Sequence, residues 1–141
     1  MTTATTYGLS ISLDRPFEAT VEATRAALAA EGFGVLMEAD LRATFQKKLG
    51  VESPPYVILG ACSPSHAREA LNVDADLGLL LPCNVIVRRD EMSGRTRVAA
   101  IDPVVALSKQ RYQMNEIAPA AVLGITKFCL RTGSHSCRQD K

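Results

Sequence analysis

The sequence predicts an α+β fold, with a single mostly antiparallel sheet of about five strands and helices packed mainly on one face. Segments with the patterns of strands alternate with helical segments, starting at Tyr7–Leu13, where apolar and small or polar residues alternate. The last two strands, Val85–Arg89 and Thr96–Ile101, are joined by a turn-rich connection typical of an antiparallel hairpin. This hairpin favours an α+β sheet over a doubly wound parallel one.

The first strand leads into an alanine-rich helix, because Asp14 and Pro16 provide the chemistry of a helix start and Gly32 that of a helix end. Its expected apolar face carries Phe17, Val21 and Leu28. Residues Gly34 to Ala39 are expected to form the second strand.

A short amphipathic helix is expected next, since apolar residues recur at i, i+4 and i+8. These residues are Leu41, Phe45 and Leu49. Asp40 is suited to the N-cap, Lys47 and Lys48 to the last turn, and Gly50 to the position just beyond it. The following Ser53-Pro54-Pro55 interrupts regular structure.

The apolar, partly β-branched run Tyr56–Ala61 predicts a strand in the middle of the sheet, with Cys62 at its C-terminal end. Ser63 is expected to be an N-cap, followed by Pro64 at the first helical position. The helix that they begin includes His66 and the residues Ala67 to Leu71.

The pattern after Asp102-Pro103 is weakly helical from Val104 to about Lys127, with a break or kink expected at Pro119. The polar tail from Arg131 to Lys141 is expected to fray. The whole chain, 1–141, is predicted to be one domain, since 141 residues is an ordinary length for a single core.

Composition disfavours several classes of function. The net charge of +1, the 5% aromatic content and the lack of Trp argue against nucleic-acid binding. The chain has no apolar run of about 18 residues, and its start lacks the pattern of a signal peptide. We therefore expect a cytoplasmic protein without a membrane partner. Its four cysteines include no CxxC pair, which disfavours a structural zinc site.

Cys62 is the candidate catalytic residue, because amides at the start of the following helix favour negative charge and can lower a thiol pKa. Cys83 follows Pro82 at the start of another expected strand and lies nearby if the two strands are neighbours. Together with His66, the two thiols form a weak candidate set for a soft metal ion such as copper(I) or zinc. The alternative is that both cysteines are core residues and His66 is an exposed helix residue.

Other polar residues are candidates for ligand binding alongside Cys62 and Cys83. They are Asp40, Lys48, Asn84 and Asp102. Each also has a structural interpretation as a helix-end or turn residue. No recognised nucleophile, zinc-protease, phosphate-loop or dinucleotide motif occurs, so no catalytic reaction or resident cofactor is predicted.

Several segments, in this order, resemble the bacterial and archaeal family called domain of unknown function 302. They are Glu31-Gly32-Phe33-Gly34-Val35, Asp40 to Gly50, Leu59-Gly60-Ala61-Cys62 with Pro64, Leu79 to Val85, and Ile101-Asp102-Pro103. The resemblance covers a core of about 7–107, and the segment 108–141 departs from the family's charged terminal helix. It implies a compact α+β domain that forms a homodimer, with no assigned chemistry.

Two functions are therefore expected as alternatives. The first is a non-enzymatic homodimeric module that binds an unidentified small molecule or protein partner in an apolar cleft between sheet and helix, or at the dimer seam. The second is a thiol-dependent redox or soft-metal-handling protein that uses Cys62 with Cys83, which requires a lowered thiol pKa. A purely structural dimer is a third interpretation that the sequence does not separate from the first.

Overall fold

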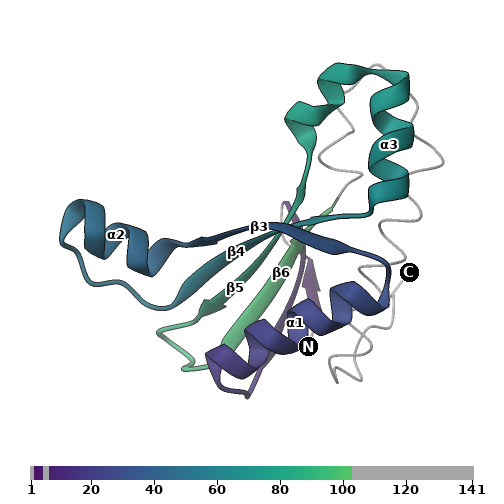
Figure 1. The fold of residues 1–141 in the computed structure, drawn as a ribbon. Helices are drawn as coiled ribbons and strands as arrows, with labels where there is room; N and C mark the ends of the chain where they lie inside the picture. Colours follow the sequence, from purple (N-terminus) through teal and green to yellow (C-terminus); the bar gives the residue numbers. More distant parts are fainter. Residues whose placement is uncertain (1, 5–6, 103–141) are drawn as a thin grey trace.

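The computed structural model describes residues 2–4 and 7–102, which form a six-stranded sheet with three α-helices and a short 3-10 helix (Figure 1). The strands are β1 (Thr2–Ala4), β2 (Gly8–Leu13), β3 (Gly34–Asp40), β4 (Tyr56–Cys62), β5 (Cys83–Arg89) and β6 (Thr96–Ile101). The helices are α1 (Phe17–Ala30), α2 (Leu41–Leu49), α3 (Pro64–Val73) and the 3-10 helix η1 (Ala75–Leu80).

The strand order across the sheet is β1-β2-β6-β5-β4-β3, and all neighbouring strands are antiparallel. The predicted α+β class and antiparallel sheet are therefore confirmed. The predicted hairpin joins β5 to β6, with Gly94 at a positive φ of 66° in its turn. The short strand β1 extends the sheet beyond the elements expected from the sequence.

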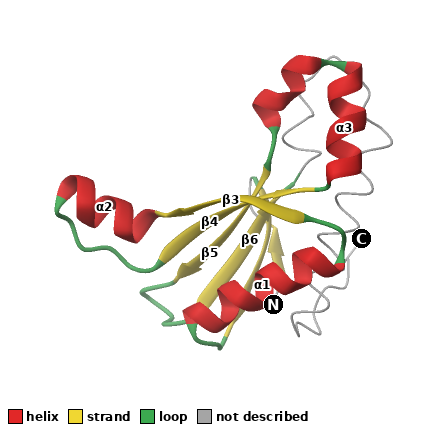
Figure 2. Ribbon diagram, viewed as in Figure 1, coloured by secondary structure: helices red, strands yellow, loops and turns green. Residues whose placement is uncertain are grey.

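Helix α1 lies diagonally across one face of the sheet, as Figure 2 shows. In β2, β4, β5 and β6, period-2 alternation places one set of apolar side chains on this face. The core combines them with side chains of α1: Ile11, Leu13, Val21, Ala27, Leu28, Val57, Leu59, Ala61, Val85, Val87, Val98 and Ala100. Phe17, which the sequence analysis assigned to the apolar face of this helix, packs against the same core.

Two threonines of α1 are fully buried against the sheet, a feature that the apolar pattern did not predict. The Thr20 hydroxyl donates to the Pro16 carbonyl (2.8 Å), and the Thr24 hydroxyl donates to the Thr20 carbonyl (2.7 Å). Each polar group thus has a partner within its own helix, which removes most of the cost of burying it.

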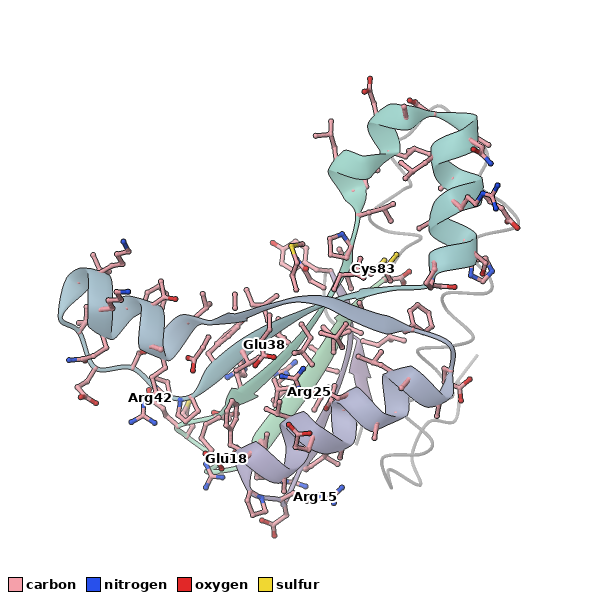
Figure 3. The ribbon with its side chains drawn as sticks, viewed as in Figure 1. Arg15, Glu18, Arg25, Glu38, Arg42 and Cys83 are labelled. Carbon is pink, nitrogen blue, oxygen red and sulfur yellow. The ribbon has the colours of Figure 1, made fainter. Side chains whose placement is uncertain are left out.

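An ion pair joins α1 to the edge of the sheet. The Arg25 guanidinium on α1 contacts the carboxylate of Glu38 on β3, and the two side chains point toward each other in Figure 3. Arg25 also contacts Glu22, one turn earlier on the helix (3.4 Å). The pair links α1 to the edge strand β3.

The other helices extend beyond the ends of the strands (Figure 2). Helix α2 continues directly from β3, and its two ends have the predicted caps. The Asp40 carboxylate accepts a hydrogen bond from the Ala43 N–H (2.9 Å), and Gly50 has a positive φ of 65°. Helix α3 and η1 lie at the opposite end of the sheet.

One local expectation needs correction. Ser63 occupies the N-cap position of α3, but its hydroxyl makes no capping bond and instead contacts His66 Nδ1 at 2.8 Å. Cys62 is buried, in agreement with the alternative that it is a core residue. The helix expected over 104–127 and the fraying tail lie outside the described residues. Within the described ranges, no helix has the length and apolar character needed to cross a membrane.

Replacing Leu59 by Ala should lower the free energy of unfolding by about 2–5 kcal/mol, because this side chain is fully buried under α1. Ile58→Ala is the matched control, since Ile58 is the adjacent half-buried residue on the other face of β4. It should cost about half as much or less, because less apolar area is lost. Denaturant unfolding measures both, and equal costs would contradict a core confined to the α1 face.

Candidate functional site

The structure divides the candidate site residues between the two ends of the sheet. Cys62, Cys83, Asn84 and Asp102 lie at the end next to α3, where β4 and β6 finish and β5 begins. Asp40 and Lys48 lie on or beside α2 at the other end. Figure 3 shows this separation, with Cys83 near α3 and Arg42 near α2. The six candidates therefore do not line a common site.

Cys62 and Cys83 lie on neighbouring strands, as the thiol hypothesis required. Cys83 stands directly opposite Ala61, so Cys62 is one residue out of register with it. Because successive side chains of a strand point to opposite faces, this offset directs the two thiols toward different sides of the sheet. Cys62 is buried, Cys83 is half-buried, and both are free thiols.

Both thiols have raised pKa values, whereas the thiol hypothesis requires a lowered pKa at Cys62. Burial raises the pKa of Cys62 above its ordinary value. Burial also raises the pKa of Cys83, and a negative charge on neighbouring Cys62 raises it further. The lowered pKa expected at Cys62 from the start of α3 is therefore wrong, because desolvation disfavours the thiolate.

His66 does not complete a metal site with the cysteines. Its Nδ1 contacts the Ser63 hydroxyl in the first turn of α3. Across residues 2–4 and 7–102, no group of three or more His, Cys, Asp or Glu side chains is arranged to hold a metal ion. The weak candidate set of Cys62, Cys83 and His66 is thus not assembled as one coordination sphere.

Pro82, just before β5, packs closely against β4. This close packing explains why position 60 of β4 is a glycine. A Cβ at Gly60 would lie 2.7 Å from Cγ of Pro82 and 3.4 Å from Cβ of Met37. Gly60 is therefore needed for close approach, as its place inside a strand indicates. Asn84 pairs directly with Gly60 and is exposed, while the Asp102 N–H donates to the Tyr7 carbonyl (2.9 Å).

The described residues around α2 form a hollow of about 280 Å³. It is lined by Asp40, Arg42, Ala43, Gln46, Glu52 and Ser53. Asp40 is the one sequence-predicted candidate in this lining, and its carboxylate already caps α2. All of its lining residues except Ala43 carry polar or charged groups, and the hollow lies beside α2, not between the sheet and α1 where an apolar cleft was expected.

A group of exposed apolar residues, which no sequence pattern predicted as a site, lies at the same end of the molecule. We call residues 36–51, the later part of β3 with α2 and Val51, the arm. Its exposed apolar side chains are Leu36, Met37, Phe45, Leu49 and Val51. The helical spacing of Phe45 and Leu49 was the available signal, since it predicted an amphipathic helix with both residues on its apolar face. In the structure no residue of α2 is buried.

Comparison with known proteins places this geometry in a family. The chain is similar to a protein of known structure, an uncharacterized conserved DUF302 protein from Bacillus stearothermophilus. The TM-score is 0.72 and the sequence identity is 25%. The match covers 86% of this chain and 91% of that one. A search among curated proteins found no relative. The model of the family "Domain of unknown function DUF302" matches residues 9–128, beyond the core of 7–107 expected from the sequence. The chain belongs to the DUF302 family.

Proposed function

We propose that this protein is a homodimeric binding module for a small molecule or protein partner, and that two copies associate through the arm. The exposure of the arm supports this proposal. Leu49 is 69% and Phe45 38% exposed, although they lie at the i and i+4 positions that form one helix face. Leu36 and Met37 of β3 are also more than half exposed.

A second copy is the occupant that the composition of the arm favours. Helix α2 carries Lys47 and Lys48 in its last turn, whereas acidic residues stand at its start and just beyond its end, at Asp40 and Glu52. A twofold arrangement of two arms can therefore bring basic and acidic groups together around an apolar centre. A nine-residue helix is also marginal without tertiary packing, so contacts with a partner would stabilise α2.

The edge of the sheet offers a second contribution to association. β3 is the outermost strand at its side of the described sheet, next to β4 alone. Edge strands present backbone N–H and C=O groups that another chain can pair with. An interface that combines this edge with α2 would continue from sheet to helix without a gap in the chain.

Leu49→Glu should convert the dimer to a monomer, because it places a charge in the apolar centre of the proposed interface. Leu79→Glu is the matched control, since Leu79 is 88% exposed on η1 at the opposite end of the molecule. Light scattering after gel filtration should give the dimer mass for wild type and Leu79→Glu. Circular dichroism should show that both variants are folded. Dissociation by Leu79→Glu but not by Leu49→Glu would move the interface away from the arm.

The second candidate function is thiol chemistry, and the position of Cys62 beside Cys83 on neighbouring strands is what favours it. Oxidation of such a pair would require the strand ends to shift, because the register directs the side chains to different faces. The raised pKa of both thiols means that little thiolate is present at neutral pH. We therefore rank this function below the binding module.

Alkylation of the native reduced protein should be slow at pH 7 and should accelerate only above the ordinary thiol pKa. Cys83 should react before Cys62, because it is half-buried and Cys62 is buried. Peptide mass spectrometry of each site over a pH series measures this order. Since the unfolded chain loses its thiol protons at lower pH, unfolding should also become easier across that alkaline range. Rapid modification of Cys62 at pH 7 would instead move thiol chemistry to first place.

A further inference from the structure

Two arginines face each other across neighbouring strands on the face of the sheet opposite α1. Arg88 of β5 is paired directly with Arg97 of β6. Their strand neighbours Val87 and Val98 are in the core, so alternation directs both arginines to the opposite face. Both side chains are half-buried. Like charges directly opposite each other in a sheet are destabilising, so this pairing calls for an explanation.

The described part of the chain supplies no carboxylate partner for this pair. The two ion pairs formed between residues within the ranges 2–4 and 7–102 both belong to Arg25. One guanidinium N–H of Arg97 donates to the Ser10 hydroxyl (2.7 Å), which holds that side chain along the sheet. Asp90 is half-buried, and the Met92 N–H, and to a smaller extent the Arg88 guanidinium, lower the pKa of its carboxyl, but that carboxylate forms no ion pair with Arg88.

On the two outer strands, the residues paired with these arginines carry hydroxyl groups, so that the four side chains form one row across the sheet. Arg97 is opposite Ser12 of β2, and Arg88 is opposite Tyr56 of β4. Both residues are half-buried and share the face of the arginines. The row across four strands therefore presents two guanidinium groups in its middle, with a hydroxyl-bearing side chain at each end. Guanidinium groups bind carboxylate and phosphate oxygens through paired hydrogen bonds.

An apolar row runs parallel to the arginines, two residues further along each strand. Ala99 of β6, Ile86 of β5 and Ile58 of β4 stand opposite one another and are half-buried. Neighbouring strands are about 4.8 Å apart, so the three side chains span roughly 10 Å. The two rows lie about 7 Å apart along the strands. One ligand could therefore contact the arginine row with an anionic group and the apolar row with a hydrocarbon part.

We propose that this face binds a small organic anion, with its carboxylate or phosphate between Arg88 and Arg97 and its apolar part on Ile86, Ala99 and Ile58. The inference rests on the proposed function in that it treats the protein as a binding module, and it names the chemistry of the ligand. It does not depend on which surface joins the two copies. The anion offsets the repulsion between the arginines, and the apolar row selects against inorganic ions.

Charge composition favours an anion from outside the chain. Residues 103–141 carry six basic side chains and two acidic ones. The basic residues are Lys109, Arg111, Lys127, Arg131, Arg138 and Lys141, and the acidic ones are Glu116 and Asp140. The net charge of this segment therefore has the same sign as the arginine pair.

The test is calorimetric titration of the full chain with octanoate, octyl phosphate, inorganic phosphate and octylammonium. Wild type should bind the first two, inorganic phosphate at least tenfold more weakly, and octylammonium not at all. Arg88→Gln should weaken the two organic anions at least tenfold. Arg89→Gln is the matched control, because Arg89 is the next residue on β5, is also half-buried and faces the other side. It should change affinity less than twofold.

Arg88 is the better position to replace, because Arg97 also holds Ser10. Without ligand, Arg88→Gln should melt at or above the wild-type temperature, since it removes a like-charge contact. Added octanoate should raise the melting temperature of wild type and Arg89→Gln but not of Arg88→Gln. Equal loss of affinity in Arg88→Gln and Arg89→Gln, or equal binding of octylammonium and octanoate, overturns the site.

Light scattering on the same samples separates this inference from the proposed dimer. A dimer that binds neither octanoate nor octyl phosphate overturns the anion site and leaves the dimer proposal standing. A monomer that binds both through Arg88 overturns the dimer and supports the anion site. If octanoate binds and octyl phosphate does not, the ligand class narrows to carboxylates, and the reverse result narrows it to phosphates.

Discussion

The register of β2, β6, β5 and β4 is the constraint on which the rest of the structure depends. In these four antiparallel strands, apolar side chains on one face stack in matched rows such as Ile11, Val98 and Val87. A slip of one residue in any strand would send its whole apolar set to the other face. Burial under α1 therefore fixes the register, and the same register determines which polar residues meet on the opposite face.

The two faces of the sheet consequently have different roles. Helix α1 covers one face through apolar packing, and its buried threonines donate hydrogen bonds to carbonyls four residues earlier. The Arg25–Glu38 ion pair adds a contact with β3. The opposite face carries Arg88 and Arg97 beside Ile86, a combination with no use in a core. Because burial under α1 is enough to hold the register, the polar residues opposite can be selected for binding.

The ends of the sheet also differ in character. At one end, Gly60 packs closely against Pro82, and burial raises the pKa of the Cys62 thiol. At the other, the chain continues from β3 into α2, which carries exposed apolar side chains. The first end has the features of a structural junction, and the second has those of a surface that a partner covers. This contrast is why the binding module ranks above thiol chemistry.

The sequence by itself determined the α+β class, most boundaries of the elements from β2 to β6, and the caps of α2, because periodicity and capping are local properties. The strand β1 and the 3-10 helix η1 were not expected from it. Family membership was also visible in the ordered segments. The tertiary structure decided what no local pattern encodes. It separated Asp40 and Lys48 from Cys62 and Cys83, buried Cys62 enough to raise its pKa, and left Phe45 and Leu49 exposed. Strand order and pairing register also set Arg88 against Arg97, since contacts between strands depend on how distant segments pair.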